Sequence, residues 1–130
     1  SSSSNKILVM LSLAGYNFSS TNYGVAGSGA LRRKIASGSF ASIGVGQGNT
    51  NFNGSFNMGQ VNSYQYTAQV NKTFLDSPNT TSACTYGIAV ADHNNSTQTF
   101  YLNRMGISFS DNPYSPSLSS SIIAMEVVNE

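Results

Sequence analysis

Apolar and polar residues along this chain form short blocks, and residues that favour turns separate the blocks. Residues 6–13 (KILVMLSL) and 120–128 (SSIIAMEVV) are nearly continuous apolar runs, which is typical of strands buried on both faces. Residues 30–40 and 64–70 alternate instead, as strands with one buried face do. No window of helical length shows a 3.6-residue period, so the pattern predicts strands throughout.

The alternation assigns faces within these two segments. Leu31, Arg33 and Ile35 share one face of the first, and Arg32 and Lys34 lie on the other. In the second segment the residues expected on one face are Tyr64, Tyr66, Ala68 and Val70.

The rest of the chain reads as shorter strands and loops. Strands are expected over residues 41–45, 52–58, 73–75, 85–91 and 99–103. Residues 14–29, rich in Gly, Asn and Ser, are expected to form a loop. About eight strands separated by turns predict an all-β chain folded as an antiparallel, jelly-roll-like β-sandwich.

The two terminal strands carry the strongest further expectation. A sandwich buries one face of each strand, so a strand that is apolar on both faces needs a second cover. A partner chain would supply that cover. The candidate subunit interface comprises Ile7, Val9, Leu11, Ile123, Met125 and Val127.

Domain boundaries follow from the same pattern. We expect a single domain over residues 6–130. Residues 1–5 are expected to be a linker or an expression remnant, with the natural chain continuing upstream.

Charge narrows the classes of partner. Only 8% of the residues are charged, against about 25% in a typical soluble domain, and the net charge is +1. Binding to nucleic acid needs many Lys and Arg residues near phosphates, so we expect none here. The short cluster of Arg32, Arg33 and Lys34 is interpreted as a solvated or ion-paired strand patch. No apolar run approaches the ~18 residues of a membrane span, so no membrane insertion is expected.

The inventory of reactive side chains is small. His93 follows Asp92 in a predicted hairpin loop, but the nucleophile motif G-x-S-x-G is missing. One histidine and one cysteine, Cys84, cannot supply a tetrahedral metal site within one chain, although a threefold axis would gather three copies of His93. We therefore expect no metal, no cofactor and no intrachain disulfide.

Carboxylates are the remaining catalytic candidates. A glycoside-hydrolysing pair would have to come from Asp76, Asp92, Asp111, Glu126 and Glu130. Asp76, ahead of Ser77 and Pro78, is interpreted as a turn residue that bonds its own backbone. Glu126 is interpreted as an outward or ion-paired residue, with Arg33 or Arg104 as partner. The sequence favours a non-enzymatic chain, and a glycan-processing enzyme with a carboxylate pair at a subunit interface stays open as the weaker alternative.

Four stretches taken together resemble a known module. They are LRRKIASGSF, KTFLDSPNTTSACTYGIAVAD, QTFYLNRMG and SSIIAMEVV, whose common elements are Leu31-Arg32-Arg33, residues 74–86, Tyr101 to Arg104 and Ser120 to Val128. In order and spacing they resemble a C-terminal module of bacteriophage tail-fibre and other virion-surface proteins, common in marine and cyanophage-like sequences. The resemblance covers most of residues 6–128.

The resemblance implies a trimeric β-sandwich head at the end of a virion fibre or appendage. It supplies no catalytic residues. It implies location on the virion, with copies of the same chain and other virion proteins as partners. A capsid decoration or head-fibre protein that only stabilises the particle is the alternative.

Host recognition would use loops at one end of the sandwich. The host partner would be a surface glycan or protein. The candidate loops cover residues 16–29, 46–54 and 112–117, together with the loop around His93. The candidate receptor-facing residues are Tyr16, Tyr23, Asn49, Asn51, His93, Asn94, Asn112 and Tyr114.

Overall fold

The computed structural model describes residues 2–19, 25–46, 54–61, 67–92, 99–103 and 118–128. Over these ranges the chain is all-β, and none of the described residues belongs to a helix long and apolar enough to cross a membrane. The strands are β1 (Lys6–Ser19), β2 (Val25–Ile35), β3 (Ala41–Ile43), β4 (Phe56–Val61), β5 (Ala68–Asp76), β6 (Cys84–Asp92), β7 (Thr99–Leu102) and β8 (Ser121–Val127).

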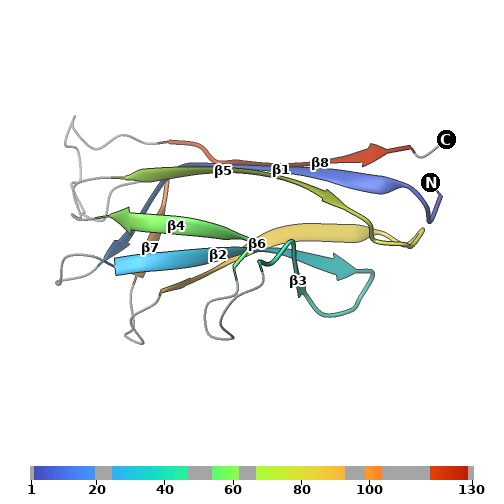
Figure 1. Cartoon of the computed structure of the whole chain (residues 1–130), viewed down its shortest axis with the longest axis horizontal. Helices are drawn as coiled ribbons and strands as arrows, with labels where there is room; N and C mark the ends of the chain where they lie inside the picture. Colours follow the sequence, from blue (N-terminus) through green and yellow to red (C-terminus); the bar gives the residue numbers. More distant parts are fainter. Residues whose placement is uncertain are drawn as a thin grey trace.

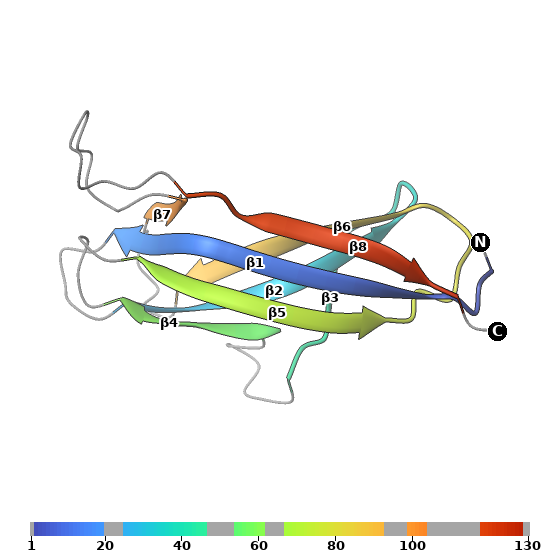
Figure 2. The same cartoon turned by 90° about the horizontal axis from the view of Figure 1, so that it is seen from above.

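The strands form two antiparallel sheets that lie face to face (Figure 1). In sheet A, β1 is central: β5 runs along one side, while β8 and then β7 pair with the other (Figure 2). In sheet B, β2 is central, with β6 on one side and β3 and β4 on the other. This two-layer arrangement is consistent with the predicted β-sandwich. The jelly-roll strand order stays a prediction.

The core lies between the two central strands. Alternate residues of β1, namely Val9, Leu11 and Leu13, are buried, and Leu31 of β2 is fully buried beneath them. Ile43 and Met58 complete the cluster. The alternation follows from the pleat, which sends every second side chain of β1 toward sheet B.

A buried serine fastens the strands of sheet B. The Ser55 hydroxyl donates to the carbonyl of Ile43 at 2.5 Å and accepts the N–H of Leu31 at 2.9 Å. A buried hydroxyl that makes both bonds avoids the cost of an unsatisfied polar group. Ser55 therefore joins β2 to the end of β3 just ahead of β4.

The prediction of a loop over residues 14–29 is wrong, because β1 continues to Ser19 and β2 begins at Val25. Gly29 is needed where strands approach closely: a Cβ there would lie 2.0 Å from the ring of Phe56, its partner on β4. Gly15 lies at an irregularity of β1, and a Cβ there would lie 2.5 Å from Leu118. These glycines mark close approach within a sheet rather than a turn.

The two chain ends lie beside each other. β8 pairs with β1 from Lys6 opposite Val127 to Ser12 opposite Ser121, and the termini share one end of the molecule (Figure 1). Among the described strands β8 has no second neighbour, so it lies at the edge of sheet A there.

Candidate functional site

The structure corrects the β1 part of the predicted subunit interface. Val9 and Leu11 are buried in the core, and Ile7 packs against the same cluster. All three side chains point toward sheet B, so a partner chain cannot reach them in this fold. The residues of β1 that face away from the core are the even-numbered ones, Leu8 and Met10 among them.

The predicted interface residues of β8 have a different environment. Ile123, Met125 and Val127 are all exposed, with 48% of Ile123 accessible to solvent. Register places Met125 beside Leu8 and Ile123 beside Met10, so these side chains share the outer side of sheet A. Leu75 of β5, 47% exposed, lies on the other side of Leu8.

These neighbours form one patch across three strands, which we name the outer apolar face. Its members are Leu8, Met10, Leu75, Ile123, Met125 and Val127. Lys6, opposite Val127, is the only charged residue of β1, β5 and β8 on this side of the sheet. A contiguous apolar area of this kind on a chain with 8% charge is characteristic of a surface that contacts another macromolecule.

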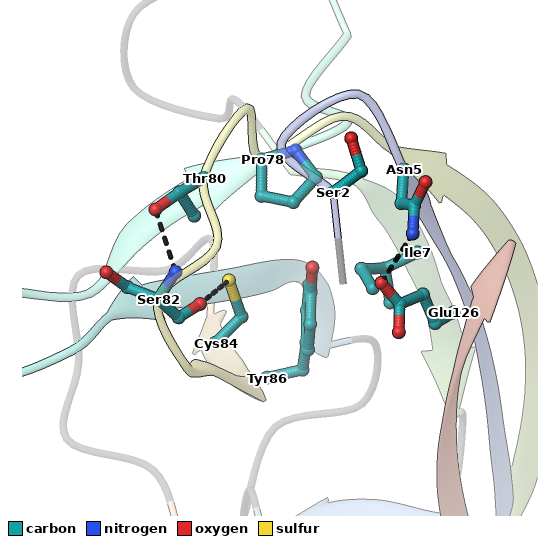
Figure 3. Close-up of a pocket in the computed structure, with 9 residues that line it drawn as sticks. All are labelled: Ser2, Asn5, Ile7, Pro78, Thr80, Ser82, Cys84, Tyr86 and Glu126. Carbon is teal, nitrogen blue, oxygen red and sulfur yellow. Dashed lines mark hydrogen bonds between the residues drawn. The ribbon is translucent and has the colours of Figure 1, made fainter. Parts of the chain in front are cut away.

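A small cavity lies at the end of the molecule that holds both termini (Figure 3). Its volume is about 150 Å³. Its walls come from the N-terminal segment, the β5–β6 connection, the start of β6 and β8. The lining residues are Ser2, Asn5, Ile7, Pro78, Thr80, Ser82, Cys84, Tyr86 and Glu126.

The polar groups around this cavity bond mainly to one another. Asn5 Nδ2 donates to Glu126 Oε1 at 2.8 Å, and the Cys84 thiol donates to the carbonyl of Ser82 at 3.6 Å (Figure 3). A nucleophilic thiol needs a neighbouring base or positive charge. No Lys, Arg or His lines the cavity, and the carboxylate that does, Glu126, accepts from Asn5, whereas the Cys84 thiol donates to Ser82. In the described part of the chain, no three His, Cys, Asp or Glu residues gather as metal ligands would.

Asn5 also bears on the expected domain boundary. It is 8% exposed, and its backbone N–H donates to the carbonyl of Ser2 at 3.1 Å. With its side chain bonded to Glu126, it is packed against the domain rather than extended away from it. The expected linker therefore overlaps the fold at its last residue.

Beside the cavity, Asp76 forms a cluster that joins the sheets. Arg33 Nη1 donates to both carboxylate oxygens of Asp76, at 2.7 and 2.8 Å, and the Tyr86 hydroxyl donates to Oδ2 at 2.7 Å. Asp76 belongs to sheet A, whereas Arg33 and Tyr86 belong to sheet B. Asp76 thus ties the layers together rather than bonding its own backbone as predicted, and the partner of Arg33 is Asp76 rather than Glu126.

The environment of this cluster shifts two pKa values in the same direction. The hydrogen bond to Asp76 raises the pKa of Arg33 above its ordinary value. Burial raises the pKa of Tyr86, and the hydrogen bond to Asp76 raises it further. The phenol therefore keeps its proton and acts as a donor, not as a base.

Two carboxylates lie on either side of Ile7, which pairs with Asp76 on β5 and with Glu126 on β8. The backbones of Asp76 and Glu126 are therefore two strand spacings apart, about 10 Å. Asp76 makes three hydrogen bonds to Arg33 and Tyr86 and does not line the cavity. The pair therefore lacks the free acid and free base that glycoside hydrolysis requires. The side chain of Asp92, and Asp111 and Glu130, lie outside the described residues.

The predicted ion pairing of the basic strand patch is confirmed for Arg33, whose partner Asp76 lies in the other sheet. Besides the ion pair of Arg33, Arg32 Nη2 donates to the carbonyl of Phe40 at 2.6 Å. The Lys34 ammonium lies 5.4 Å from the centre of the Phe40 ring. These contacts fold the turn after β2 back onto its own strand.

Of the predicted receptor-facing residues, the structure places only Tyr16, and not in a loop. It belongs to β1, where it pairs with Leu102 of β7. The others lie outside the described residues: Tyr23, Asn49, Asn51, His93, Asn94, Asn112 and Tyr114. Their role in recognition stays a prediction.

Sequence reasoning missed the Arg33–Asp76–Tyr86 cluster, although one signal for it was present. Arg33 alternates with Leu31 and Ile35, so it shares the core-facing side of β2. An arginine on a buried face needs an acidic partner. The chain has few acids, and searching them for a partner to Arg33 would have identified Asp76.

No protein-family model matches the chain, and neither a curated protein nor a solved structure matches it.

Proposed function

We propose that this chain is a structural subunit of a virion-surface appendage: a fibre head that associates with copies of itself and recognises the host surface. The observation that carries the proposal is the outer apolar face. It lies mainly on the β1–β8 pair, and the β8 segment, Ser120 to Val128, also carries part of the resemblance to phage fibre modules. Contiguous exposed apolar areas are typical of surfaces that contact another macromolecule, which an assembly subunit needs.

The two ends of the molecule suit different roles, attachment at one end and recognition at the other. Both termini lie at one end, which suits attachment to an upstream shaft (Figure 2). The end of β1 at Ser19, the start of β2 at Val25 and the end of β6 at Asp92 meet at the opposite end (Figure 2). The segments that join these strands include residues predicted to face the receptor, such as Tyr23 and His93.

We further propose a trimer with a jelly-roll sheet order. The pairing of β1 with β8 supports the jelly-roll part, because the chain ends are neighbours in that fold. The open edge of β8 is where such a fold places a further strand. The trimer rests on the resemblance and on the outer apolar face that an assembly would cover.

A non-enzymatic role is favoured by the chemistry of the described residues. The cavity near the termini offers hydroxyls, an amide and one bonded carboxylate, without a base placed beside a nucleophile. Asp76 and Arg33, the strongest polar pair, hold the sheets together.

Labelling on intact particles tests the proposal. An antibody raised against residues 1–130 should mark the tips of fibres in electron micrographs, and the purified chain should bind host cells and compete with particles for them. Label spread over the capsid with no binding to cells would instead indicate a particle-stabilising decoration protein. No label on any particle would overturn both roles.

A further inference from the structure

β8 exposes apolar side chains on both of its sides. Ile123, Met125 and Val127 lie on the outer side, within the outer apolar face. Ile122 pairs with Leu11 and so points to the inner side, but it remains 41% exposed where Leu11 is 4% exposed. The difference reflects position, because β8 lies at the edge of sheet A whereas β1 is its central strand.

The inner side of β8 is a second surface, which we name the inner flank. It consists of Ile122, Ala124 and Glu126, all exposed. The two surfaces differ in shape and chemistry: the outer apolar face spans three strands, whereas the inner flank is one strand wide. A contact between two identical outer faces would leave the inner flank uncovered. A contact that seats the inner flank of one copy on the outer apolar face of the next covers both.

Charge complements this head-to-tail arrangement. Lys6, beside Val127, is the charged group at the edge of the outer apolar face, and Glu126 is the charged group of the inner flank, with one carboxylate oxygen accepting from Asn5. Both lie at the same end of the β1–β8 pair. When neighbouring copies point the same way, the ammonium of one lies level with the carboxylate of the next, which favours this register over others.

The exposed edge of β8 adds a third argument. Proteins protect free edges with charged residues, Pro, β-bulges or very short strands. β8 (SIIAMEV) is seven residues long, has no Lys or Pro, and carries a single charged residue, Glu126. By contrast, β5 has Lys72 and Asp76 within its strand, and β3 has three residues.

The outer apolar face is small. It covers five residue positions of β1 and β8, about 17 Å by about 10 Å, with Leu75 beside them on β5, or roughly 200 Å² of sheet plane. One such contact is small for a stable pair, which needs about 1,000 Å² in total, so contacts on both sides of each copy are favoured.

We infer that β8 is the self-association strand of this chain, with the outer apolar face of one copy receiving the inner flank of β8 from the next. A head-to-tail contact uses two different surfaces on each copy and closes into a ring when the rotation allows. This inference rests on the proposed function as an assembly subunit. It goes beyond that function by naming the two surfaces and their pairing.

Solution mass of the chain and three variants tests the inference. Val127→Glu places a charge on the outer apolar face beside Lys6, where the single chain tolerates it. Ile122→Glu places one on the inner flank. Val45→Glu is the matched control, since Val45 is 44% exposed and Val127 is 40% exposed, but Val45 lies near sheet B. Light scattering after size exclusion gives the mass, and circular dichroism verifies that each variant is folded.

We expect the unchanged chain and Val45→Glu to form a species of several chains. Val127→Glu and Ile122→Glu should each be a single chain at tenfold higher concentration. An equimolar mixture of these two can form one contact but cannot close a ring, so its mass should rise above that of one chain only at high concentration. Assembly of folded Ile122→Glu would contradict the head-to-tail contact and favour outer faces packed on each other. A monomeric unchanged chain would overturn self-association, while host binding or particle labelling could still support the proposed function.

Discussion

β1 and β8 have the same kind of sequence and opposite environments. Both are nearly continuous apolar runs, and they pair side by side over seven residues. Yet Val9 and Leu11 on β1 are buried, whereas every residue of β8 is exposed. The difference is position: β1 is the central strand of sheet A and lies over sheet B, while β8 is at the edge.

The comparison shows what a continuous apolar run does and does not predict. It indicates a strand whose two faces both need cover, but the covers can come from different molecules. For β1, one cover is sheet B and the other face remains part of the outer apolar face. For β8, neither cover is present within the described part of this chain, which is why we propose that neighbouring copies supply them, one on each side.

The largest loss of stability is expected where Leu11 of β1 pairs with Ile122 of β8, at the buried residue of the two. Leu11→Ala should lower the free energy of unfolding by about 3 kcal/mol, because it leaves a cavity in the core. Ile122→Ala, at the paired position on β8, should cost under about 1 kcal/mol in dilute protein. Urea unfolding of both variants at two protein concentrations measures this.

The contrast between Leu11→Ala and Ile122→Ala should depend on protein concentration. If a second copy covers β8, the cost of Ile122→Ala should grow as protein concentration rises, while the cost of Leu11→Ala stays the same. Equal and concentration-independent costs at both positions would mean that β8 is covered within its own chain.

A similar contrast is expected between the carboxylates beside Ile7. Asp76→Asn weakens a buried ion pair with Arg33 and should cost about 2 kcal/mol of unfolding free energy. Glu126→Gln keeps an oxygen that can accept from Asn5, and should cost under about 0.5 kcal/mol. The urea midpoints of the two variants measure the difference, and equal losses would show that the Arg33–Asp76 pair does not hold the sheets together.

The strand pattern was predictable because it depends on local sequence. The all-β class and the positions of most strands follow from apolar blocks and turn residues. The buried side of Leu31 and the half-buried sides of Ala68 and Val70 follow from alternation.

Which face of β1 points to the core was not predictable from hydrophobicity, because the odd-numbered and the even-numbered residues of KILVMLSL are both mostly apolar. The two polar residues of the segment, Lys6 and Ser12, are both even-numbered, and this is the weak signal that the odd-numbered residues face inward. The extent of β1 and β2 was missed for a related reason. Glycine reads as a loop residue, whereas Gly29 accommodates the ring of Phe56 inside a sheet.

The same contrast between covered and open positions is expected for two glycines. Gly29→Ala should cost about 1–3 kcal/mol, because the new methyl group would meet the ring of Phe56. Gly46→Ala is the control, since a Cβ there meets nothing within 4 Å, and should change stability by less than about 1 kcal/mol. Thermal unfolding measures the stability of both variants. A Gly29→Ala variant as stable as the unchanged chain would mean that β2 and β4 are farther apart than described.

The smallest effect is expected at the polar edge of the covered region, where Tyr86 meets Asp76. Tyr86→Phe removes one hydrogen bond to a buried carboxylate and should cost about 1 kcal/mol near neutral pH. Because the native pKa of Tyr86 is raised, the folded chain keeps a proton that the unfolded chain, with a tyrosine pKa of about 10, releases. Above about pH 10 the unfolded state binds fewer protons, so the stability of the unchanged chain falls as pH rises.

Tyr86→Phe cannot undergo this loss, so its disadvantage should shrink between about pH 9 and about pH 11 and then reverse. Urea midpoints of both proteins over this range measure the crossing. Parallel curves would indicate that the phenol is as accessible to solvent in the folded chain as in the unfolded one. The covered region would then end before Tyr86.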